Sequence, residues 1–134
     1  MSQLESPPAT VHRLRPIRVL LIGTDTRFLR VAGALLASEG HSVEASDKPS
    51  ELLELVYTQG SDVVVIDASA SLTHAARAAA SLEAMPVPVA AVLVADQERI
   101  PSVGALALVA KWGSFHELSE RVERAYEWRR LACA

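Results

Sequence analysis

The run "DVVVIDA", residues 62–68, restricts the possible fold of this chain more than any other stretch. Its central residues, 63–66, are all valine or isoleucine, with no polar residue between them. This composition is typical of a strand that is buried on both faces. Such strands occur mainly in parallel sheets that helices cover on both sides. The run therefore predicts an α/β protein.

The rest of the chain repeats the same unit, an apolar run followed by a helical pattern. Strands are expected at residues 17–22, 41–46, 62–68, 89–94 and 105–110. Helices are expected after residue 25, at 47–60, at 70–84 and from residue 114, with a weak element at 96–104. Five strands alternating with helices imply parallel strands joined by right-handed crossovers. We therefore predict a flavodoxin-like, doubly wound five-stranded parallel sheet with the strand order 2-1-3-4-5.

Length and composition limit the number of domains, the class of partner and the cellular compartment that we expect. The 134 residues fit one domain, which we place at residues 16–132, after a flexible tail at 1–15. The net charge of −3 is too small to indicate a nucleic-acid or membrane partner. The most apolar stretch, 87–95, is too short to cross a bilayer, and the single cysteine, Cys133, has no disulfide partner. These features predict a soluble cytoplasmic protein.

Chemistry in this fold is expected at the carboxyl ends of the strands. Asp67 ends the third strand and Lys111 ends the fifth. We expect strands 1, 3 and 5 to lie side by side, so that these two side chains approach each other. A lysine beside a carboxylate favours its ionised form and can neutralise a phosphoryl group. The spacing fits either an ordinary structural ion pair or a functional site.

The segments "RVLLIGTD", "GHSV", "SDVVVIDAS", "PVAAVLVAD" and "LVAKWGSFHEL" resemble the receiver domain of two-component response regulators (the CheY-like fold). The resemblance covers residues 16–131. It implies a signalling domain, not an enzyme, that accepts a phosphoryl group on an aspartate with the help of Mg²⁺. Asp67 matches the phosphoacceptor of that family, and Lys111 matches its lysine.

Other positions depart from the family pattern. The acidic pair that holds Mg²⁺ in the family is replaced by Gly23 and Thr24, and Asp25 comes one residue late. The hydroxyl residue after strand 4 is replaced by Val94 or Ala95. Mg²⁺ needs near-octahedral oxygen ligands, so Asp67 with Asp25 alone would make a poor metal site.

Two further departures lie around the lysine. The aromatic residue expected three positions before it is Leu108, and the proline expected after it is Trp112. Without the hydroxyl and the aromatic ring, a phosphoryl group has no differential contact with a second conformation and cannot shift a population. Trp112 is expected to fill the vacated pocket; the alternative is an exposed binding anchor.

We therefore predict an atypical receiver-like domain that needs no cofactor and binds another signalling protein, a kinase or a downstream effector. A homodimer stays open as well. One alternative is a working phosphorelay receiver that accepts phosphate on Asp67, with Mg²⁺ held by Asp25 and Asp67. Another is a small-molecule or nucleotide-binding domain that uses the same cleft. The metal-free prediction depends on Asp25, which we expect to cap its own helix rather than turn toward Asp67.

Overall fold

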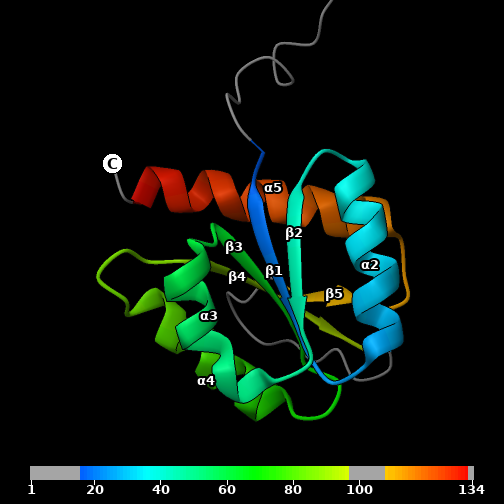
Figure 1. Cartoon of the computed structure of the whole chain (residues 1–134), viewed down its shortest axis with the longest axis horizontal. Helices are drawn as coiled ribbons and strands as arrows, with labels where there is room; N and C mark the ends of the chain where they lie inside the picture. The colour runs from blue at the N-terminus through cyan, green and yellow to red at the C-terminus, as the bar shows by residue number, and fades with distance from the viewer. Residues whose placement is uncertain (1–15, 97–107, 133–134) are drawn as a thin grey trace, which may run out of the picture.

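The computed structural model describes residues 16–96 and 108–132. The strands are β1 (Arg18–Ile22), β2 (Ser42–Ser46), β3 (Val63–Asp67), β4 (Ala90–Ala95) and β5 (Leu108–Ala110). The helices are α2 (Thr26–Ser38), the short 3₁₀ helix η2 (Pro49–Glu51), α3 (Leu52–Gln59), α4 (Leu72–Glu83) and α5 (Phe115–Ala132). Helices lie on both sides of one central sheet (Figure 1).

The sheet is parallel throughout and has the order β2-β1-β3-β4-β5, as predicted. The second strand, β2, lies at one edge and has no fully buried residue. The expectation that strands 1, 3 and 5 are neighbours is wrong, because β4 lies between β3 and β5. A side chain from β5 must therefore reach across the end of β4 to meet Asp67.

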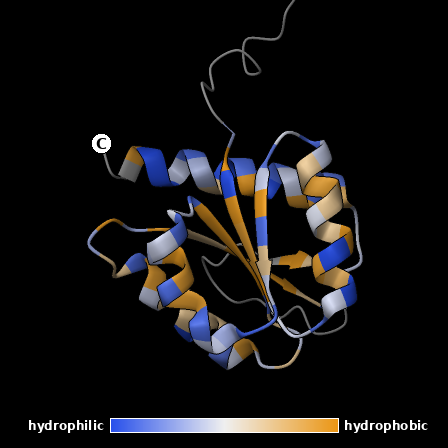
Figure 2. Ribbon diagram, viewed as in Figure 1, coloured by the Kyte–Doolittle hydropathy of each residue, from blue (hydrophilic) through white to orange (hydrophobic). Residues whose placement is uncertain are grey.

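The strands alternate their side chains between two cores. On one face, the cluster with Val19, Leu21 and Val65 packs under α2 and α5. On the other face, the cluster with Leu20 and Ile66 packs under α3 and α4. The middle strands are hydrophobic along nearly their whole length (Figure 2). Because β1 and β3 are buried on both faces, only their ends can carry exposed chemistry.

The structure differs from the sequence prediction at the second helix. The helix predicted at 47–60 is divided into η2 and α3, and neither Asp47 nor Ser50 caps it. Pro49 instead opens the 3₁₀ turn. Residues 97–104 of the weak element, and 105–107 of the predicted fifth strand, lie outside the described residues. The predicted tail at 1–15 and Cys133 lie outside them as well.

Candidate functional site

Three charged side chains meet at the carboxyl end of the sheet. Asp67 is the last residue of β3, Lys111 directly follows β5, and Asp25 is the N-cap of α2. The backbone N–H of Lys111 donates to Ala95 O at 2.8 Å, which holds the start of the lysine against the end of β4. The side chain then extends over β4 toward β3. The fold thus brings together residues that are far apart in the sequence.

The Lys111 ammonium lies between the two carboxylates. Its Nζ is 2.8 Å from Asp67 Oδ2 and 2.9 Å from Asp25 Oδ2. The Lys111 and Asp67 side chains are only 7% and 5% exposed, whereas the Asp25 side chain is 35% exposed. One cation therefore serves two anions, of which one is buried and the other faces water.

The second oxygen of each carboxylate binds a backbone amide. Ser69 N donates to Asp67 Oδ1 at 3.0 Å, and Phe28 N donates to Asp25 Oδ1 at 3.1 Å. Asp25 thus caps α2, as expected, but it also turns inward to Lys111. The prediction that Asp25 caps its helix rather than turning inward set these two contacts against each other. Asp25 makes both, because a carboxylate has two oxygens.

Lys111 and Asp25 favour each other's ionised forms. The hydrogen bond from Lys111, and then that from Phe28 N, hold the pKa of Asp25 below its ordinary value. Burial acts to lower the pKa of Lys111, but the hydrogen bonds to Asp67 and Asp25 outweigh it, so the pKa of the lysine is raised. Lys111 and Asp25 are consequently charged in neutral water.

Gly23 lies against Asp67, at a position where the receiver-domain pattern has an acidic residue. This glycine is buried, and a Cβ added to it would lie 2.7 Å from Asp67 Cβ. Real Cβ atoms do not approach this closely, so any side chain at position 23 requires the backbone to move. Thr24, the next residue, is exposed. The close packing of Gly23 on Asp67 was not foreseen from the sequence.

The neighbouring strand offers no hydroxyl to Asp67. Val94 is its register partner across β3 and β4, and Ala68 N donates to Val94 O at 2.6 Å. Val94 and Ala95 are both buried. Leu108 pairs with Leu93 in the backbone register, and its side chain lies outside the description. The described surroundings of Asp67 on β4 are therefore apolar.

Trp112 is partly packed and partly exposed. Its ring packs edge-to-face against Phe28, with centroids 5.6 Å apart, and against Phe115, at 6.2 Å. It nevertheless stays 48% exposed, with the Arg27 guanidinium 5.6 Å from its centroid. Phe28 in turn lies 5.5 Å from Lys111 Nζ. The three rings form one wall of the site, a cluster that was not predicted from the sequence.

These residues do not fit a magnesium ion. One oxygen of Asp25 and one of Asp67 are bound to the Lys111 ammonium. A third carboxylate side chain has no room at position 23. Mg²⁺ needs oxygen ligands in near-octahedral arrangement, and the neighbouring ammonium of Lys111 repels a divalent cation. Within residues 16–96 and 108–132, no three acidic, histidine or cysteine side chains form a group that could hold a metal.

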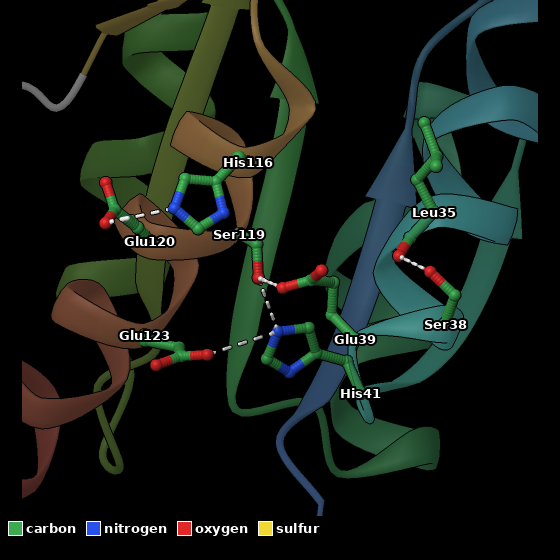
Figure 3. Close-up of polar contacts among 8 residues, drawn as sticks. All are labelled: Leu35, Ser38, Glu39, His41, His116, Ser119, Glu120 and Glu123. Carbon is green, nitrogen blue, oxygen red and sulfur yellow. Dashed lines mark hydrogen bonds and ion pairs between the residues drawn. The ribbon is translucent and has the colours of Figure 1, made fainter. Parts of the chain in front are cut away.

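A second polar cluster joins α2 to α5 away from this site. Ser119 Oγ donates to Glu39 Oε1 at 3.3 Å and lies 3.1 Å from His41 Nε2 (Figure 3). Glu123 Oε2 lies 3.8 Å from the same nitrogen. Ser119 is 2% exposed and His41 is 5% exposed, whereas Glu39 is exposed and the Glu123 side chain is 47% exposed. The cluster is therefore a polar connection between α2 and α5 that is buried at the serine and histidine and open to water at the glutamates.

The comparisons with known proteins identify the fold. No protein-family model and no curated protein sequence matches the chain. The structure is similar to a sensor protein from Polaromonas sp. JS666, with a TM-score of 0.73 and 16% identity over 84% of this chain and 98% of that one. It is also similar to a response regulator receiver domain protein from Clostridium thermocellum, with a TM-score of 0.71 and 18% identity over 87% and 98%.

A third similar structure is an orphan response regulator from H. pylori, with a TM-score of 0.63 and 18% identity over 82% of this chain and 96% of that one. None of the helices in the described parts of the chain combines the length and apolar composition that a membrane crossing needs. The strand order, the crossovers and these likenesses agree. The chain has the CheY-like flavodoxin fold of response regulator receiver domains.

Proposed function

We propose that this chain is a receiver-like signalling domain that acts by contact with another signalling protein, without Mg²⁺-dependent phosphorylation and without enzymatic activity of its own. The fold supports the signalling class. The observation that carries the rest is the position of the Lys111 ammonium, which contacts both Asp25 and Asp67. This ammonium already binds the carboxylate oxygens on which a metal would depend, which supports the metal-free part of the proposal.

Phosphoryl transfer to Asp67 would meet two obstacles. Both carboxylate oxygens of Asp67 are engaged, one by Lys111 and the other by Ser69 N. Charge on a transferring phosphoryl group is stabilised in such reactions mainly by cations and oriented donors. The single Lys111 ammonium already offsets two negative charges, so less of its charge is left for a phosphoryl group.

Signal readout by a phosphoryl group would meet a third obstacle. Val94 and Ala95 present apolar side chains at the end of β4. A ligand shifts a conformational equilibrium only through contacts that differ between the two states. With no hydroxyl at either position, a phosphoryl group on Asp67 lacks such a contact there. We therefore assign the signal to the binding of a partner protein. One of the similar structures is itself an orphan response regulator.

The test is the response of the chain to phosphoryl donors. We expect amide NMR spectra recorded with acetyl phosphate or beryllofluoride, each with Mg²⁺, to show no saturable shifts at Ala68, Ser69 and Lys111. Asp67→Asn removes the acceptor, and Asp47→Asn is the control at an exposed aspartate. A saturable response that persists in Asp47→Asn and disappears in Asp67→Asn would overturn the proposal in favour of a working phosphorelay receiver.

A second candidate function is small-molecule binding beside Asp67. A cavity of about 330 Å³ lies between the ends of β1 and β3 and the first turns of α4. Its apolar lining includes Ile22, Leu52 and Ile66, and the described residues around it include no lysine or arginine. This lining suits a neutral or cationic ligand better than a nucleotide. Thermal unfolding with a panel of metabolites and with ATP and ADP tests it, and stabilisation by the nucleotides would contradict this preference.

A further inference from the structure

The cavity beside Asp67 lies where the helices that follow two neighbouring strands part to opposite faces of the sheet. Helix α2, which follows β1, packs on one face, and helix α4, which follows β3, packs on the other. In open α/β sheets this divergence leaves a crevice outside the carboxyl ends of the two strands, and ligands bind in it. The cavity of about 330 Å³ lies at this place and has the size of a small-molecule site.

Apolar side chains line one part of the cavity. Ile22 and Ile66 come from the ends of β1 and β3, and Ala75 and Ala78 come from α4. The two alanine side chains are short, so larger residues at these positions would fill the space. A polar group buried here without a hydrogen-bond partner would cost free energy. The ligand that suits this part of the lining therefore has an apolar body.

Oxygen atoms characterise the other part of the lining. Asp67 carries a carboxylate there, and Thr24 and Ser50 carry hydroxyl groups. Lys111 binds one oxygen of Asp67, and Ser69 N binds the other. Each carboxylate oxygen has two lone pairs, so Asp67 can accept a further hydrogen bond. A group with several donors and no acceptor matches this part of the lining best.

The charges around Asp67 favour a positively charged group. Asp25 and Asp67 together carry two negative charges, and Lys111 offsets only one of them. Among the described residues that line the cavity, none is a lysine or an arginine, and His74 is the one titratable group besides Asp67. The start of α4 adds a partial positive charge of about one half, and Ser71 already caps one of its amides. The balance of charge thus stays negative.

We propose that the cavity beside Asp67 binds a small primary amine. Its ammonium group donates to the Asp67 carboxylate, and its apolar body packs on Ile22, Ile66 and the alanines of α4. An ammonium has three donors and no acceptor, so the hydroxyl oxygens beside Asp67 can accept its remaining hydrogen bonds. This inference rests on the second candidate function and names the class of its ligand.

Amide NMR titrations of the full chain at pH 7 test the ligand class. The probes are benzylamine, benzyl alcohol and benzoate, which have similar size and differ in charge. We expect a dissociation constant on the order of 1 mM for benzylamine, with saturable shifts at Ser69, Ala75 and Ala78. Benzyl alcohol should bind at least about tenfold more weakly, because it lacks the charged hydrogen bond, and benzoate should not bind. Equal binding of amine and alcohol, or tighter binding of benzoate, would overturn the proposal.

Three variants locate the binding. Ala78→Leu fills the cavity from a half-buried position and should raise the benzylamine constant at least about tenfold. Ala80→Leu is the matched control at an exposed position of the same helix, and should leave the constant within about twofold. Asp67→Asn keeps the shape of the side chain but removes its charge, so the preference for the amine over the alcohol should disappear. Unchanged binding in Ala78→Leu, or an unchanged preference in Asp67→Asn, would contradict the proposed site.

The outcomes separate this inference from the functions on which it builds. Equal binding of benzylamine and benzyl alcohol, lost in Ala78→Leu, would keep the small-molecule site and remove only the amine. No binding of any probe would remove the amine as well. All titrations omit Mg²⁺ and phosphoryl donors, so none of these results bears on the test of phosphorylation at Asp67.

Discussion

Asp62 directly precedes strand β3 and Asp67 ends it, and the two aspartates are held in different ways. At the amino end, Asp62 accepts a hydrogen bond from Arg18 N at 3.0 Å, and its other oxygen is 3.5 Å from Arg129 Nη1. At the carboxyl end, Asp67 has the Lys111 ammonium at 2.8 Å. Both side chains are almost fully buried, at 7% and 5% exposure. Burial alone therefore does not distinguish them.

The two aspartates differ in the side-chain cation that binds each of them. The backbone amide of Arg18 is fixed by the sheet, and Arg129 also donates to Pro88 O, so the amino end has several weak contacts. Asp67 also has a backbone donor, Ser69 N, but its cation is a lysine that it shares with Asp25. The cation at the carboxyl end is therefore close and serves two acids, whereas the Arg129 contact with Asp62 is longer. The predictions below test this contrast.

The largest effect should come from removing the cation at each end. Lys111→Met leaves Asp25 and Asp67 facing each other with no positive charge, and should lower the free energy of unfolding by about 3 kcal/mol. Arg129→Met removes a longer, partly exposed contact and should cost about 1 kcal/mol. Urea unfolding at pH 7 measures both. Equal losses in the two variants would show that the ends of β3 are equivalent.

A smaller effect is expected from filling the space beside Asp67. Gly23→Ala forces a Cβ to within 2.7 Å of Asp67 Cβ and should cost about 1–3 kcal/mol. Gly33→Ala is the matched control, because its Cβ would meet Leu21 Cδ1 at an ordinary 3.5 Å inside α2. That change should be neutral or stabilise the chain by up to about 1 kcal/mol. If both variants are equally stable in urea, the packing of Gly23 on Asp67 is not tight.

The smallest effect is expected in the loss of folding stability at low pH. Because the folded pKa of Asp25 lies below its ordinary 3.8, the stability it provides is present above that pH and is lost as the pH falls toward the folded pKa. Asp25→Asn keeps a side chain that can cap α2 but removes the charge. Its stability should therefore fall less steeply than that of the parent between about pH 4 and pH 2. If the stability of the two proteins falls equally steeply as the pH is lowered, the result would contradict a charged contact between Asp25 and Lys111.

The fold could be predicted from the sequence because the apolar pattern of each strand matches its burial. The apolar runs of β1, β3 and β4 require helices on both faces, and this requirement led to the strand order. The meeting of Asp67 with Lys111 followed from the topology, although the path of the lysine over β4 did not. The double role of Asp25 and the ring wall around Trp112 depend on side-chain directions. No spacing rule supplies these directions, because they are set by packing between elements distant in the chain.

The contact between Gly23 and Asp67 also determines how this protein can change by mutation. A single substitution that restores an acid at position 23 first meets a Cβ overlap of the kind that costs stability. A bound cation can compensate for this cost only after the Lys111 ammonium has moved away from the two carboxylates. Since proteins stay only slightly above the stability they need, the intermediate is disfavoured. The path from this domain to a metal-dependent switch therefore has a barrier at its first step.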